Sequence, residues 1–235
     1  MDNLNKILNE FDLCRTKMLI DKEKVWDADA VAKCFEPCAK EILLNGFFLV
    51  KNRYIIELGS IELYYHEENG PIKDYIMYHR ENRIYSKIKE YNKGELPYFD
   101  FGSLNLHQSG VDITFENEQE KYRASFLIRA FRVIPKDDNV SNNQIVFDSR
   151  STYIFDELFY SGILWGQGSE SAIKWVSCDN KNIENITLLR EPRRNVCKYG
   201  EPSFDLIKGR WIDNKILNEK DTRAWQFIRP DVKIK

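Results

Sequence analysis

Helical and strand-like patterns occupy different parts of this chain, and that separation restricts the fold more than any other feature. Apolar residues recur at helical spacing over 4–20, and a second helical pattern covers 30–43 after the potential caps Asp27 and Asp29. Runs rich in Ile, Tyr and Phe then predict strands at 47–51, 54–58, 60–65, 111–116 and 123–133. Because strands and helices do not alternate regularly, the pattern argues against a doubly wound parallel sheet.

We therefore expect an α+β fold of the mixed type, a single domain over 1–235 with a curved, mainly antiparallel β-sheet flanked by helices. The first helical segment is expected to form an extension over 1–25. Residues 152–165 look helical or mixed, and short strand-like pieces follow at 186–189 and 225–228. Hydrophobic residues make up 43% of the 235 residues and aromatic residues 13%, which excludes a disordered chain and allows a substantial core.

The charge balance excludes a uniformly basic nucleic-acid binder, because the formal net charge is −2. Local basic regions remain. Residues 80–93 combine Arg and Lys with Tyr85 and Tyr91, a composition found in loops that face nucleic acid and equally in solvated loops. Residues 180–235 hold 13 Lys or Arg against 8 Asp or Glu, which is a weak indication of an anionic partner beside the simpler reading of a solvated surface.

The cysteines indicate a reducing compartment. An odd number in a chain of this length does not suggest a disulfide framework, and Cys34 and Cys38 have the spacing of one helical face. We expect all five to be free, namely Cys14, Cys34, Cys38, Cys178 and Cys197. The sequence has no apolar run long enough to cross a membrane, and its first residues lack the apolar core of a signal peptide. These features predict a cytoplasmic protein without a membrane partner.

The polar residues of chemical interest cluster between 62 and 129. They are Glu62, Tyr64, His66, His79, His107, Asp112 and Arg129. The three histidines with one of the two carboxylates would suit zinc or iron, but none of the histidines has tight ligand spacing. Simple packing of these histidines is the stronger alternative, and we expect no metal.

A carboxylate site is the second possibility. Strand alternation places Glu62 on one face with Ser60 and Tyr64, opposite the apolar Ile61. Such a Glu can activate a water while the neighbouring ring stacks on a flat substrate. Arg129 interrupts an apolar run and needs a carboxylate partner if it is buried, for which Glu62 is a candidate. A purely structural Glu–Arg pair is the competing interpretation.

The order of several segments resembles the alkyladenine (3-methyladenine) DNA glycosylase family. The segments are AVAKCFEPCAKEILLNGFFLV, SIELYY, GPIKDYIMYH, GSLNLHQSGVDITFE and ASFLIRAFRVI, followed near the end by EPRRNV and RAWQFIR. They match the family's helix and turn, its Glu-Ala-Tyr strand, its Gly-Pro-x-Asp…His loop, its hairpin and its Leu-Leu-Arg-Ala strand. The similar segments run over roughly 30–230, with no similarity recognised in 134–185.

The resemblance implies a role for four residues. Glu62 matches the catalytic Glu that activates the attacking water, and Arg129 matches the arginine near that water. Tyr64 matches the aromatic that stacks on the flipped base, and His79 matches the histidine that lines the base pocket, after a two-residue insertion. A base must leave the stack for its glycosidic bond to become accessible.

The chain departs from the family at three positions. Asp112 stands where the family has the Asn that screens out the amino group of guanine, so we expect tolerance of an amino-bearing base. Asn105 stands where the family wedges a tyrosine into the duplex, although Leu104, Leu106 or His107 could act as a wedge. Gly102 stands at the second stacking aromatic, with Phe99 and Phe101 beside it. Phe101, Asn105, His107 and Asp112 are therefore further candidates for substrate binding.

The function implied is that of a monofunctional DNA N-glycosylase of base-excision repair, a monomer that hydrolyses the N-glycosyl bond of a modified purine without a cofactor. The stem at 98–112 would face the minor groove, and the basic segments would contact phosphates. Two alternatives remain. The same site could act on a free nucleoside, nucleotide or similar small molecule, or the chain could be a binding module without enzymatic activity.

Overall fold

The computed structural model describes residues 2–21, 23–77, 98–107, 109–136, 146–159, 173–178, 183–194, 196–207 and 210–234. Its helices are α1 (Asp2–Ile20), α2 (Ala28–Leu44), α3 (Ser151–Phe159) and the 3₁₀ helix η2 (Ile183–Asn185). The basic loop predicted at 80–93 and His79 lie outside the described residues. None of the described helices combines the length and apolar character needed to cross a membrane.

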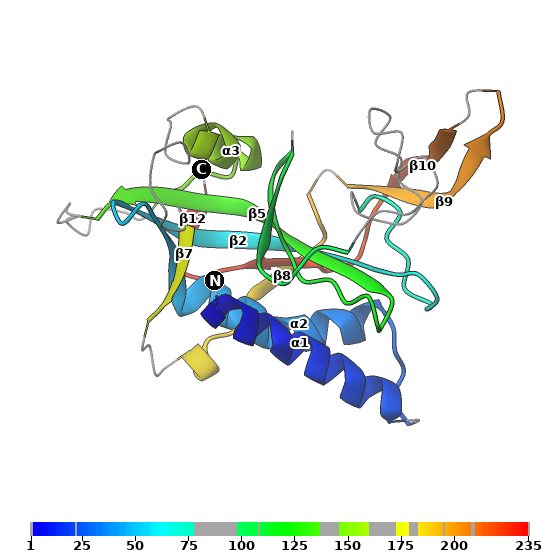
Figure 1. The fold of residues 1–235 in the computed structure, drawn as a ribbon, viewed down its shortest axis with the longest axis horizontal. Helices are drawn as coiled ribbons and strands as arrows, with labels where there is room; N and C mark the ends of the chain where they lie inside the picture. The colour runs from blue at the N-terminus through cyan, green and yellow to red at the C-terminus, as the bar shows by residue number, and fades with distance from the viewer. Residues whose placement is uncertain are drawn as a thin grey trace.

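The strands form one large antiparallel sheet and two small ones. The large sheet has the order β3-β4-β5-β2-β1-β7, and β11 joins it by pairing with both β2 and β8. Its strands are β1 (Gly46–Val50), β2 (Tyr54–Glu67), β3 (Ser103–His107), β4 (Gly110–Thr114), β5 (Tyr122–Pro135), β7 (Ile173–Ser177), β8 (Leu189–Glu191) and β11 (Gln226–Ile228). The sheet curves around the helices (Figure 1). The predicted α+β class with a curved, mainly antiparallel sheet is confirmed.

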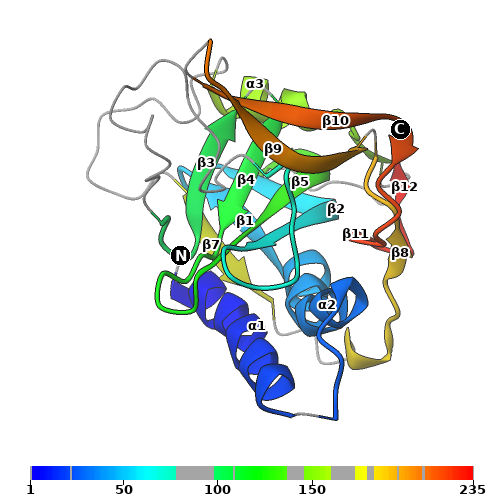
Figure 2. The ribbon, with the colours of Figure 1, turned by 90° about the vertical axis from the view of Figure 1, so that its right-hand side faces the viewer.

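The two N-terminal helices cover one face of the large sheet, while α3 lies on the other (Figures 1 and 2). Asp27 is the N-cap of α2, and its carboxylate accepts from the N–H groups of Asp29 and Ala30. Helix α1 contributes to the common core, because Leu4, Leu8 and Phe11 have no exposed surface. The apolar residues of the two helical patterns therefore pack against the large sheet, in a core formed by α1, α2 and β2.

A disulfide joins the two helices. Cys14 on α1 is bonded to Cys34 on α2 across a Cα–Cα distance of 5.4 Å, so the expectation that all five cysteines are free is wrong for this pair. The helical face that carries Cys34 also carries Cys38, whose thiol donates to the carbonyl of Ile7 at 3.1 Å. Spacing along one helix cannot show which cysteine the packed partner helix presents. Cys38, Cys178 and Cys197 are not part of a disulfide.

Strand β2 is a single element where the sequence predicts two runs. The register between β2 and β5 shifts on either side of Ser60, which marks a bulge rather than a break. Gly59 lies at this point, where an added Cβ would come within 2.6 Å of the Phe147 ring. The close approach of the ring explains why glycine interrupts the apolar pattern here without ending the strand.

A two-stranded ribbon of β9 (Cys197–Asp205) and β10 (Arg210–Lys220) projects from the molecule on the same face of the sheet as α3 (Figures 1 and 2). The sequence patterns do not predict it. Between its strands, Leu206 and Ile207 are almost fully exposed. The third sheet is a short parallel pairing of β6 (Val146–Phe147) with β12 (Lys233–Ile234). The piece expected at 186–189 overlaps β8 only at Leu189.

Candidate functional site

The candidate residues form a row across neighbouring strands of the large sheet. Glu62 on β2 is opposite Leu127 on β5, which is opposite Asp112 on β4. Asp112 in turn is opposite Asn105 on β3. Residues directly opposite in an antiparallel sheet share a face. The row lies on the face away from α1 and α2, since the alternate residue Ile61 belongs to the helix-covered core.

Glu62 is fully buried and is held by three donors. Its Oε2 accepts from Arg129 Nη2 at 2.7 Å and from the Tyr64 hydroxyl at 3.0 Å. Its Oε1 accepts from the backbone N–H of Arg194 at 2.8 Å. The ion pair suggested by the sequence is therefore present. A carboxylate without exposed surface is compatible with burial only because a guanidinium and two further donors surround it.

The electrostatics of this group raise the pKa of Tyr64 and of Arg129. Burial raises the pKa of Tyr64 and the charge of Glu62 raises it further, so the hydroxyl stays protonated and donates. Burial alone would lower the pKa of Arg129, but the adjacent carboxylate outweighs it and the pKa is raised. The site therefore contains a protonated phenol and a cationic arginine bonded to one carboxylate oxygen.

A cavity of about 300 Å³ lies against this group. Its wall includes Tyr64, Met77, His107, Asp112, Ser125 and Arg129. Within it, His107 Nε2 lies 3.2 Å from a carboxylate oxygen of Asp112. Glu62 is not part of the wall, but Tyr64 and Arg129, the two side chains bonded to its Oε2, are. The volume is at the lower end of the range of small-molecule sites.

The structure brings some of the predicted residues together and leaves others apart. Tyr64, His107, Asp112 and Arg129 line one cavity, with Glu62 bonded behind it. Phe101 does not line it; that ring packs toward the helix-covered core and contacts Phe115 at a centroid distance of 6.4 Å. Asn105 is also absent from the wall and lies opposite Asp112 in the hairpin. The position predicted for His79 falls outside the described residues.

A buried ionic cluster supports the same wall. Arg193 is bonded through Nη1 to Asp74 at 2.6 Å and through Nη2 to Asp221. Arg223 contacts both of these carboxylates, at 3.1 Å and 2.6 Å. The Arg193 guanidinium also lies over the Tyr64 ring, 4.6 Å from its centroid. The cluster therefore fixes the aromatic ring that faces the cavity.

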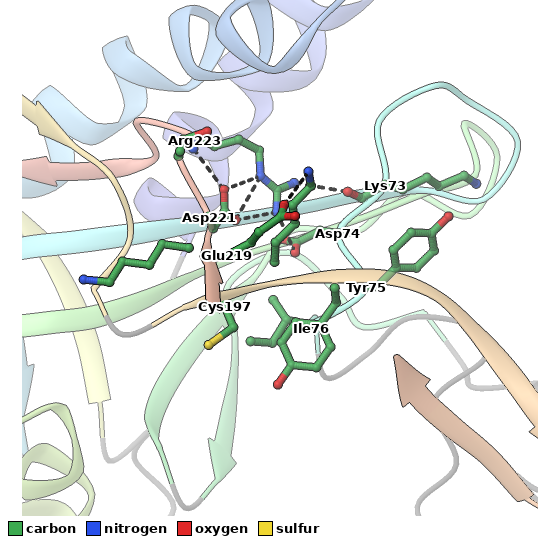
Figure 3. Close-up of a pocket in the computed structure, with 12 residues that line it drawn as sticks. Lys73, Asp74, Tyr75, Ile76, Cys197, Glu219, Asp221 and Arg223 are labelled. Carbon is green, nitrogen blue, oxygen red and sulfur yellow. Dashed lines mark hydrogen bonds and ion pairs between the residues drawn. The ribbon is translucent and has the colours of Figure 1, made fainter. Parts of the chain in front are cut away.

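The arginines of this cluster decide the direction in which the pKa values of its carboxyl groups shift. Burial alone would raise the pKa of Asp74 and Asp221, but the attraction of Arg193 and Arg223 outweighs it and lowers the pKa of both carboxyl groups. Figure 3 shows Asp221 and Arg223 directed toward each other, with Asp74 beside them, in a second cavity of about 520 Å³. This second cavity reaches Cys197 at the base of the ribbon.

Reasoning from the sequence missed the cluster and part of the cavity wall. Arg193 and Arg194 appear in the sequence only as the adjacent arginines of EPRRNV, and Asp74 only as the acid of GPIKD. A buried arginine requires carboxylate partners, which here come from distant segments. Ser125 was also missed, although it is two residues along β5 from Leu127 and so shares its face.

The metal alternative finds no assembled ligand set in the described residues. No three His, Cys, Asp or Glu side chains gather there in a way that could hold an ion. His66 Nδ1 accepts instead from the backbone N–H of Asp74 at 3.0 Å, and His107 lies against Asp112. His79 is outside the described part of the chain.

Comparison of the chain with protein-family models, with curated proteins and with solved structures finds no match in any of the three.

Proposed function

We propose that the chain is a hydrolytic N-glycosylase that excises a damaged or modified purine from DNA. One observation carries the proposal: a fully buried carboxylate, Glu62, is bonded to an arginine and a tyrosine that form the wall of a polar cavity. The residues come from β2 and β5, and they are among those that the resemblance to alkyladenine DNA glycosylases singles out. The family assignment itself is part of this proposal.

In the proposed reaction, Glu62 accepts a proton from a water as the water oxygen attacks the anomeric carbon of the nucleotide. The bond from that carbon to the base nitrogen breaks, and the leaving base takes up a proton. The negative charge of Glu62 also stabilises the positive charge that develops on the sugar. Arg129 orients the carboxylate through its ion pair with Oε2. Because Glu62 does not itself line the cavity, the water must reach it past the side chains that do.

The cavity would hold the flipped base. Tyr64 offers an aromatic wall for stacking, and its ring is fixed from behind by Arg193. Asp112 and Ser125 supply polar groups for the edge of the base. Base flipping is required because the glycosidic carbon is inaccessible in a stacked duplex.

Release of the base under single-turnover conditions tests the proposal. Duplex and single-stranded oligonucleotides that carry hypoxanthine, ethenoadenine or methylated purines are incubated with the wild-type protein and with Glu62→Gln. We expect base release by the wild type, and a loss of roughly a hundredfold or more in the variant, because the amide cannot act as the general base.

Glu57→Gln is the matched control. Glu57 forms an ion pair with Arg132 at 2.6 Å on the same two strands, but neither residue lines the cavity. This variant should release bases at the wild-type rate. Equal rates in the wild type and in Glu62→Gln would show that Glu62 and Arg129 form only a structural pair, and failure to release any of these bases would remove the proposal.

A second candidate keeps the chemistry but replaces DNA with a free nucleotide. The observation that favours it is Asn105, which occupies the hairpin position where the resemblance places an inserted tyrosine and which is paired across the hairpin with Asp112. Salt separates the two candidates. The affinity for a duplex should fall steeply between 50 mM and 200 mM salt, whereas the affinity for a single nucleotide should change little.

A further inference from the structure

Arg194 is fixed by its main chain rather than by its side chain. Its N–H donates to Glu62 Oε1 at 2.8 Å, and its carbonyl oxygen accepts from Arg129 Nη2 at 3.2 Å. Both peptide groups of the residue are thereby tied to the ion pair behind the cavity. The residue is exposed and lines the cavity. An exposed arginine therefore starts from a fixed main chain at the cavity wall.

The charge of Arg194 is uncompensated in the described part of the chain. The two other arginines nearest to it are neutralised, since Arg129 is paired with Glu62 and Arg193 with Asp74 and Asp221. No described carboxylate lies within ion-pair distance of the Arg194 guanidinium. A positive group at the edge of a cavity attracts an anionic ligand.

The wall of the same cavity also holds polar atoms that have no partner among the described residues. They are Ser125 Oγ, on a side chain with 1% exposure, and Arg129 Nε. Buried polar atoms are normally hydrogen-bonded, and those that are not often mark a ligand position. Ser125 and Arg129 can therefore donate hydrogen bonds to acceptor atoms of a ligand inside the cavity, while Arg194 can bind an anionic group at its edge.

We propose that Arg194 binds a phosphate group of the nucleotide whose base occupies the cavity. This inference rests on the proposed function and deepens it, because it makes a phosphorylated nucleotide the substrate rather than a nucleoside or a free base. The planar fork of a guanidinium matches two phosphate oxygens at once. The phosphate can belong to a free nucleotide or to a DNA strand, and the recognition chemistry is the same for both.

Equilibrium binding at constant salt tests the inference. The probes are inosine, inosine 5′-monophosphate, and single-stranded and duplex oligonucleotides with one hypoxanthine, titrated against the intrinsic tryptophan fluorescence. We expect the wild type to bind the monophosphate or the oligonucleotides at least about tenfold more tightly than inosine, since a hydrogen bond to a charged group is involved. Arg194→Ala should abolish that difference, and Arg194→Lys should retain part of it.

Arg53→Ala is the matched control, because Arg53 is an exposed arginine at the turn between β1 and β2 and does not line the cavity. It should keep the wild-type difference. Tight binding of the monophosphate identifies a free nucleotide as the source of the phosphate, and tight binding of the oligonucleotides alone identifies a DNA strand. Equal affinity of the wild type for inosine and every phosphorylated probe would overturn the inference, as would equal weakening of all probes by Arg194→Ala.

Base release measured in parallel separates the two proposals. If bases are released but the phosphate adds no affinity, the role of Arg194 is wrong and the N-glycosylase stands. If no probe binds and no base is released, both are overturned.

Discussion

At the scale of single residues, several charged side chains are buried in the interior of the protein. Glu62 with Arg129 and Arg193 with Asp74 and Asp221 are buried pairs on the same side of the sheet. Removing one partner of a buried pair leaves an uncompensated charge, which costs more than the pair contributes. These charges are therefore sensitive positions even where they never touch a ligand.

Arg193→Met should destabilise the protein strongly. The substitution leaves Asp74 and Asp221 with one arginine between them, and breaking a buried pair costs about 3–5 kcal/mol. Urea unfolding followed by circular dichroism measures the loss in the free energy of unfolding. Arg132→Met is the control on a more exposed ion pair and should cost less than about 1 kcal/mol. Similar losses in the two variants would contradict the importance of the cluster.

Acid should weaken the folded state through the same cluster. The pKa values of Asp74 and Asp221 are lowered in the folded protein, so their contribution is complete above the unfolded pKa of about 3.9 and is lost as the pH falls below it. The free energy of unfolding should therefore decrease as the pH falls below about 4. Asp221→Asn should be less stable at neutral pH but should show a shallower decrease. An unchanged slope would assign the acid sensitivity to other carboxylates.

Asp112→Asn should change which base is accepted. The carboxylate only accepts hydrogen bonds, whereas the amide can also donate. We expect the ratio of release rates for guanine-derived over adenine-derived bases to fall by roughly tenfold, the effect of one lost hydrogen bond to a charged group. Parallel single-turnover measurements on both kinds of substrate give the ratio. A ratio that does not move would show that Asp112 does not contact the base.

At the scale of elements, the helical pair and the strand β2 carry the architecture. The sequence predicts the helices and, as two separate runs, the strand β2, because the apolar residues follow the 3.6-residue and two-residue periods that packing against one face demands. The alternation around Glu62 also predicts correctly which side chains leave the core. The ribbon of β9 and β10 could not be found in this way, since its strands pair mainly with each other and include Gly200 and Pro202.

Cysteine pairing shows a second limit of the sequence patterns. A disulfide depends on which residues two packed helices present to each other, and nothing in the spacing of Cys34 and Cys38 points to Cys14 on the other helix. The same holds for Arg194. Its role depends on main-chain bonds to residues on β2 and β5, which the local sequence does not encode.

The disulfide between α1 and α2 should stabilise the protein. Cys14→Ser removes a cross-link that closes a loop of 20 residues, and we expect a loss of about 2–4 kcal/mol in the free energy of unfolding. Dithiothreitol should produce a similar loss in the wild type and no further loss in the variant. Cys178→Ser, at an exposed cysteine outside the disulfide, is the control. Alkylation in denaturant without reduction should label three of the five cysteines, because unfolding exposes the buried Cys38, and labelling of all five would contradict the bond.

At the scale of the whole molecule, α1 belongs to the same core as the sheet. The ring of Phe11 contacts Phe35, Tyr65, Phe115 and Tyr122 at centroid distances from 5.3 to 6.3 Å. The helix therefore joins α2 to β2, β5 and the segment after β4. Removing α1 would therefore expose the core of the protein to solvent.

A chain that starts at residue 21 should fail to unfold cooperatively. It loses Leu4, Leu8 and Phe11, and each buried side chain of this size contributes about 2–5 kcal/mol, which together approach the whole stability of a domain. Thermal unfolding followed by near-ultraviolet circular dichroism shows whether a cooperative transition remains. A transition like that of the full chain would instead identify α1 as a separable extension.

The pairing of β11 has a consequence for the order in which the protein is made. One edge of β2 is shared, with β1 bonded to Tyr54–Ile56 and β11 bonded to Ser60–Glu62. During translation, the edge of β2 beside Glu62 cannot pair with β11 until residues 226–228 have left the ribosome. Arg194, which binds Glu62 directly, is also made late. A nascent chain can thus build the two helices and the hairpin early, but the carboxylate acquires its final surroundings only after residues 226–228 have been made.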